Sequence, residues 1–154
     1  MGLFDWMTQV LEGRKFRQLD QTQNEALVRA LAGAMLADGE VAGAESEELE
    51  TFVDFLTWQS TTSPAAFVGE AIEDAREAVE TQDARDAFCA DVAASIDDQK
   101  VRDEIYYMAA RIVGADENLD ERERAYLESL VQALEISADT QRVVTNRLIS
   151  EELV

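Results

Sequence analysis

The stretch ARIVGADENLDERERAYLESL, residues 110–130, decides the fold of this chain. Its first part continues an apolar pattern with the 3.6-residue period of an α-helix, and acidic and polar residues follow. Asp120 and Glu123 then form the S/T/D-x-x-E pattern of a capping box, which predicts that a second helix begins there. The stretch therefore indicates a helix, a short acidic turn and another helix.

The same pattern occurs in the first half of the chain. Residues 37–41 (ADGEV) match residues 115–119 (ADENL), 78 positions later. The same offset pairs Glu45 with Glu123 and Leu49 with Leu127. An offset of about half the chain indicates two duplicated halves and not a solenoid of short repeats.

Helical periodicity extends over nearly the whole chain. We predict an all-α fold of about eight helices built from two pseudo-repeated halves. Residues 1–20 form an apolar helix and a basic segment, and residues 21–154 form the helical domain, with the repeated hairpins near 23–59 and 98–134. The expected helices cover about 2–12, 23–38, 44–59, 64–80, 83–95, 98–114, 120–134 and 137–149, with Thr22, Ser63, Asp97, Asp120 and Ser137 as start signals.

Composition excludes several classes of function. The 154 residues include 33 acidic and 13 basic side chains, for a formal charge of −20, with one Cys and no His. So negative a surface repels nucleic acids, and we expect no small-molecule substrate. Without His there is no Ser-His or Cys-His pair, so we expect a non-enzymatic protein in which carboxylates are the remaining chemical groups.

Four carboxylates stand out because periodicity directs them inward. The apolar stripe of the second expected helix ends in Ala34 and Met35, and its next member is Asp38. The sixth expected helix leads in the same way to Asp116. Traced backwards, the stripes that begin at Leu49 and Leu127 lead to Glu45 and Glu123.

Two interpretations of these acids stay open. In the first, they are local helix caps, which the positive ends of helix dipoles stabilise. In the second, they are oxygen ligands of Ca²⁺ or another divalent cation, together with Glu40 and Asn118 at the third turn positions. An EF-hand is excluded, because its sixth and twelfth loop positions would be Glu121 and Leu127 in place of Gly and Glu.

With these motifs in view, the sequence resembles the TerB family of bacterial tellurite-resistance proteins. The opening Gly2-Leu3-Phe4-Asp5, the first-half ADGEV and the stretch 110–130 carry the resemblance. It implies an all-helical fold of two related halves, a metal ion held by acidic residues, and a stress-response setting that includes membrane proteins. Ala42 departs from the pattern, because its counterpart in the second half is the capping Asp120.

The first seventeen residues suggest a contact surface. Residues 2–12 are strongly apolar, and the chain's one basic cluster follows at 14–17. This segment either docks on the domain's own core or contacts a membrane protein or membrane surface. We expect a cytoplasmic location, with a peripheral position at the inner membrane as the alternative. Cys89 is expected to be a small core residue.

Together these features predict a non-enzymatic acidic helical module of the tellurite-resistance type. It would bind divalent cations through its duplicated acidic turns and act through protein or membrane-surface partners. The alternative is an interaction scaffold in which the same turns are only helix caps. A two-metal hydrolase would need acids from both halves to converge, and nothing in the sequence indicates this.

Overall fold

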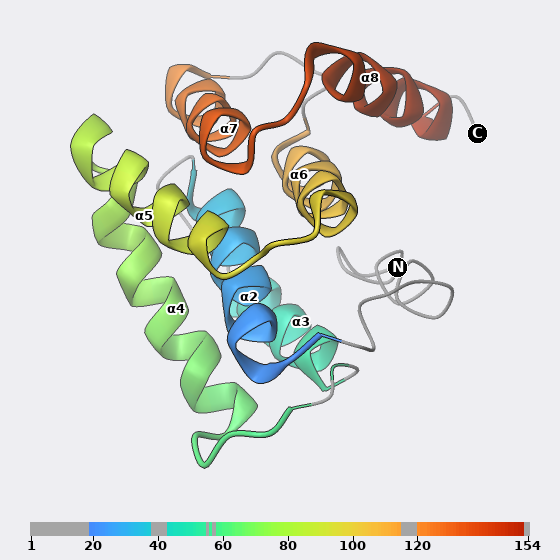
Figure 1. Ribbon diagram of the computed structural model, residues 1–154. Helices are drawn as coiled ribbons and strands as arrows, with labels where there is room; N and C mark the ends of the chain where they lie inside the picture. The colour runs from blue at the N-terminus through green and yellow to red at the C-terminus, as the bar shows by residue number, and fades with distance from the viewer. Residues whose placement is uncertain (1–18, 38–42, 55, 57, 115–119, 153–154) are drawn as a thin grey trace.

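The computed structural model describes residues 19–37, 43–54, 56, 58–114 and 120–152, and these form seven helices and no strand (Figure 1). The all-helical prediction is confirmed, and the helix expected over 2–12 lies outside the described residues. The helices are α2 (Gln21–Leu36), α3 (Gly43–Val53), α4 (Pro64–Ala78), α5 (Gln82–Ala94), α6 (Gln99–Val113), α7 (Glu121–Leu134) and α8 (Ala138–Glu152).

Most helices begin where the sequence signals indicate. Ser63 caps α4 by accepting a hydrogen bond from the amide of Ala66, with Pro64 in the first helical turn. Ser137 accepts from the amide of Thr140 at the start of α8. The residue that caps α6 is Asp98, one position after the expected Asp97.

Two expected boundaries are wrong. Helix α2 is capped by Asp20 and not by the expected Thr22, because Asp20 and Gln23 form a capping box in which the side chain of each accepts a hydrogen bond from the other's amide. The third helix ends at Val53 and not near residue 59. The chain turns away there, and the amide of Gln59 donates to the side chain of Gln21 at the start of α2, at 2.7 Å.

Helix α2 lies at the centre of the fold. It packs against α3, α4, α5, α6 and α7, and every residue from Ala30 to Ala37 is buried. A helix that is buried on all sides needs small and apolar residues around its whole circumference, as the ALAGAMLA sequence of residues 30–37 provides. In Figure 1, α4 and α5 flank α2 on one side and α6 on the other.

The contact between α2 and α7 depends on a glycine. The hydroxyl of Tyr126 donates a hydrogen bond to the carbonyl of Ala30 at 2.6 Å, and its ring lies over Gly33. A Cβ atom at Gly33 would come within 2.6 and 2.7 Å of two ring carbons. Glycine at this position therefore allows the fully buried tyrosine to reach the backbone of α2.

Arg102 joins the ends of three helices. From the first turns of α6 it donates to the carbonyls of Ala93 and Ile96, at 2.9 and 2.7 Å, which lie at the end of α5. It also donates to the carboxylate of Glu135 at 3.1 Å, just after α7. Glu135 has a left-handed backbone, with φ of 56°, which ends α7. Arg102 thus satisfies carbonyls that helix ends leave without partners.

Candidate cation site at the acidic turns

The helices on either side of the two acidic turns have matching positions in the two halves. Helix α2 begins at Gln21 and α6 at Gln99, whereas α3 begins at Gly43 and α7 at Glu121. Both pairs of starts are 78 residues apart, the same spacing that relates the two sequence motifs. The two acidic motifs therefore occupy equivalent positions between helices in the two halves of the chain.

Most residues of the apolar stripes that lead into these turns are buried. In α2 the stripe comprises Leu27, Leu31, Ala34 and Met35, all at most 4% exposed. In α3 and α7, Leu49 and Leu127 are both buried. In α6 the stripe is buried at Ile105 and Ala109 and half-buried at Ile112 and Val113. The core-facing side of each of these four helices therefore extends toward the end that adjoins a turn.

Most of the predicted ligands belong to the turns themselves. Asp38, Glu40, Asp116 and Asn118 lie outside the described residues. Glu45 lies in the first turn of α3, where the structure describes the backbone path only. Glu123 is the one predicted ligand whose side chain the structure describes.

Glu123 forms a capping box with Asp120, as the sequence predicts. The amide of Glu123 donates to Oδ1 of Asp120 at 2.8 Å, and the amide of Asp120 donates to Oε1 of Glu123 at 3.3 Å. Glu123 is half-buried, and the amide dipoles of the first turn of α7 favour its negative charge. An ionised carboxylate can accept several bonds through its two oxygens, so capping and cation binding are chemically compatible.

The described part of the chain contains no group of three or more Cys, Asp or Glu side chains that could hold a metal ion. A cation site built on Glu123 would need ligands outside this group of side chains, and Asp116 and Asn118 of the turn stay the predicted ones. The site in the first half likewise stays a prediction, with Asp38, Glu40 and Glu45 as its ligands.

Cys89, the one cysteine of the chain, is fully buried in α5, and its prediction as a core residue is confirmed. Burial raises the pKa of its thiol from 9.0 to about 12, with a further contribution from the negative charge of Asp86. The reactive thiolate is therefore scarce near neutral pH, and Cys89 is a poor redox or nucleophilic centre.

Sequence reasoning missed two arginines that hold the second half together. Arg102 is described above, and Arg147 of α8 lies 3.6 Å from the centre of the Tyr107 ring and 3.6 Å from the carboxylate of Glu104. Glu135 lies 33 residues after Arg102, and Tyr107 and Glu104 lie 40 and 43 residues before Arg147, so no local spacing indicates these pairs. A lone arginine on a helix shows which residue it pairs with only when the packing of the helices is known.

Comparison with known families gives one match. The family model described as "Tellurite resistance protein TerB" matches residues 24–144, which extend from the first turn of α2 to about the middle of α8. The comparisons with curated proteins and with solved structures give no significant match. Among the described residues, no helix is long and apolar enough to cross a membrane.

Proposed function

The chain belongs to the TerB family of tellurite-resistance proteins, and on this premise we propose that it is a non-enzymatic module that binds divalent cations. The binding sites are the two acidic turns, with Asp38, Glu40 and Glu45 in the first and Asp116, Asn118 and Glu123 in the second. The module acts through protein partners that recognise its cation-bound form.

One observation carries this proposal: the helices that flank the two turns start with the same spacing as the duplicated acidic motifs. The apolar stripes that lead into the turns are largely buried, which supports the prediction from the sequence that Asp38 and Asp116 continue these stripes. An ionised carboxylate in such a setting is costly unless it is paired, and a cation would supply the opposite charge.

The ligand chemistry favours a hard cation. Asp and Glu carboxylates, an Asn side chain and backbone carbonyls are oxygen donors, which Ca²⁺ and Mg²⁺ prefer. The net charge of −20 attracts cations and repels an anion such as tellurite. The protein therefore contributes to resistance through signalling or assembly, and not by capturing or reducing the oxyanion with its buried Cys89.

The proposal is tested by thermal unfolding with and without CaCl₂ or MgCl₂. We expect the cation to stabilise the natural chain by about 2.7 kcal/mol at one hundred times its Kd. An Asp38→Asn/Asp116→Asn variant loses this gain. An Asp74→Asn/Asp91→Asn variant is the matched control, because it removes the same charge from exposed positions of α4 and α5.

Equal stabilisation of all three proteins by the cation would show general screening and would overturn the cation sites.

The capping box of Asp120 and Glu123 favours a second function, a pure interaction scaffold. In that case no cation binds, and Asp120→Ala lowers the free energy of unfolding by about 0.5–2 kcal/mol whether or not a cation is present. Calorimetric titration with Ca²⁺ separates the two functions directly.

A further inference from the structure

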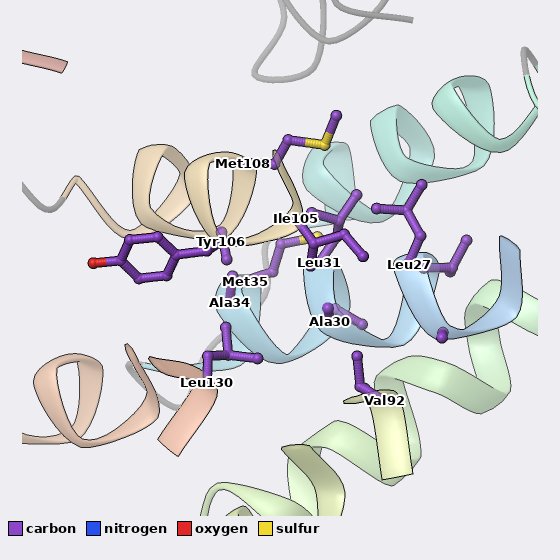
Figure 2. Close-up of a cluster of buried hydrophobic side chains, with 14 of the residues drawn as sticks. Leu27, Ala30, Leu31, Ala34, Met35, Val92, Ile105, Tyr106, Met108 and Leu130 are labelled. Carbon is purple, nitrogen blue, oxygen red and sulfur yellow. The ribbon is translucent and has the colours of Figure 1, made fainter. Parts of the chain in front are cut away.

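Two helices flank α2 without packing closely on each other. Both α3 and α6 contact α2, but α3 and α6 scarcely touch. Between them lie Leu27 and Leu31 of α2 and Ile105 and Met108 of α6, as Figure 2 shows. We call these four side chains the α3–α6 face. Met108 extends away from α2 on the side of α6 that is nearest to α3 (Figure 2).

All four side chains of the α3–α6 face are fully buried. Helix α6 is in fact buried at six consecutive positions, 105–110, so it is covered on every side. Its main partners among the described helices are α2, α7 and α8. Ile105 lies toward α2, and Arg147 of α8 stacks on Tyr107. Met108 lies on the side of α6 nearest to α3, and its full burial calls for a further apolar element on that side.

We propose that residues 2–17 are that element, and that they dock as an amphipathic helix on the α3–α6 face of their own chain. Their apolar positions Leu3, Met7, Val10 and Leu11 have the three- and four-residue spacing of one helix face. A helix over residues 2–12 would be about 16 Å long, close to the length of the eleven-residue α3.

The point where this segment joins the domain supports the docking. Leu19 is buried, with 8% of its surface exposed, so the chain is already held against the domain immediately before α2. Leu19 is only eight residues from Leu27 of the α3–α6 face, so residues 2–17 are joined to that face by a short stretch of chain. A short tether gives an effective concentration in the millimolar range, so even weak intrinsic affinity suffices for docking.

Charge also favours the chain's own surface over a membrane. The basic cluster Arg14, Lys15 and Arg17 adjoins a domain with a large excess of acid, and α3 and α6 carry the half-buried carboxylates of Glu48 and Glu104. Docking brings these opposite charges closer together. An anionic membrane would instead have to approach the same negative domain, which opposes binding.

The experiment uses full-length variants and hydrogen exchange measured by mass spectrometry. Met7→Asp and Leu11→Asp each place a charge on the apolar face of the segment. We expect both to increase exchange several-fold in α6 around 105–110 and in α3 around 49–53. Gln9→Asp is the matched control, because it adds the same charge on the opposite helix face and leaves this exchange unchanged.

Flotation with vesicles of phosphatidylglycerol and phosphatidylcholine completes the test. We expect the natural chain not to float with these vesicles. The proposal is overturned if Met7→Asp and Leu11→Asp give the same exchange in α3 and α6 as the control Gln9→Asp. It is equally overturned if neither of them differs from the natural chain in this exchange. It is also overturned if the natural chain binds the vesicles and Met7→Asp abolishes that binding without changing exchange in α6.

Discussion

Gly33 and Gly69 are both helical glycines, but their surroundings are opposite. A Cβ atom at Gly33 would meet the ring of Tyr126, whereas one at Gly69 would meet nothing within 4 Å. We expect Gly33→Ala to lower the free energy of unfolding by about 1–3 kcal/mol through overpacking. Gly69→Ala should raise it by about 0.5–1 kcal/mol, because alanine favours the helix. Urea denaturation of the two variants measures both changes.

Comparing Gly33→Ala with Gly69→Ala separates the effect of the Tyr126 contact from the general effect of alanine on helix stability. In a Tyr126→Leu background, Gly33→Ala should lower the free energy of unfolding by less than it does in the natural chain, because the smaller side chain removes the clash with the ring. If Gly33→Ala proves as stabilising as Gly69→Ala, the close approach of α7 to α2 is wrong.

Cys89 and Tyr126 make stability depend on alkaline pH. Burial raises the pKa of Cys89 from 9.0 to about 12, and it also raises the pKa of Tyr126 above 10.0. Below about pH 9 the thiol is protonated in both the folded and the unfolded chain, so stability does not change. Between about pH 9 and 12 only the unfolded thiol ionises, and the free energy of unfolding should fall by about 1.4 kcal/mol per pH unit.

Chemical denaturation at several pH values between about 8 and 10, in the presence of a reductant, measures this slope. Cys89→Ala should be less stable at pH 8, because it leaves a small cavity, but it should lack most of the fall between pH 9 and 10. An unchanged slope in Cys89→Ala would show that other groups cause the pH dependence.

At the scale of the helices, the hydrogen bonds of Arg102 join α6 to the ends of α5 and α7, and a substitution at Arg102 measures how much they contribute to stability. Arg102→Met keeps most of the apolar stem and removes the donors to Ala93, Ile96 and Glu135. We expect a loss of about 1.5–3 kcal/mol, because the bonds are charge-assisted and partly buried. Arg76→Met removes an exposed arginine that pairs with Glu73 and should change stability by less than about 1 kcal/mol.

Denaturation curves of the two arginine variants, followed by circular dichroism, give this comparison. Similar small losses in both would mean that Arg102 contributes no more than a surface ion pair does.

The helices were largely predictable from the sequence because their signals are local. Ser63 with Pro64, and Asp120 with Glu123, act within four residues of the helix start, and the apolar stripes repeat every turn. The end of α3 was not predictable, because the bond from Gln59 to Gln21 joins residues 38 positions apart. For the candidate site, the pattern indicated the capping role of Glu123, whereas the pairing of Arg147 with Tyr107 depends on how α8 packs on α6.

For the whole molecule, the charge of −20 is the dominant electrostatic property. Repulsion among the acidic side chains opposes the compact state, and salt shortens its range from about 30 Å at 0.01 M to about 3 Å at 1 M. We therefore expect NaCl to raise the thermal midpoint steadily over this range. A midpoint that falls with added NaCl would instead indicate that favourable ion pairs outweigh the repulsion.

The central position of α2 has a consequence for how the chain is made. Roughly one hundred residues must still be synthesised after α2 before α7, which packs on Gly33, is complete. At about 5–20 residues per second this delay lasts on the order of 5–20 s. During that time the most apolar helix emerges on the ribosome with few of its five partners, so the nascent chain, more than the finished protein, is the form exposed to aggregation and to chaperones.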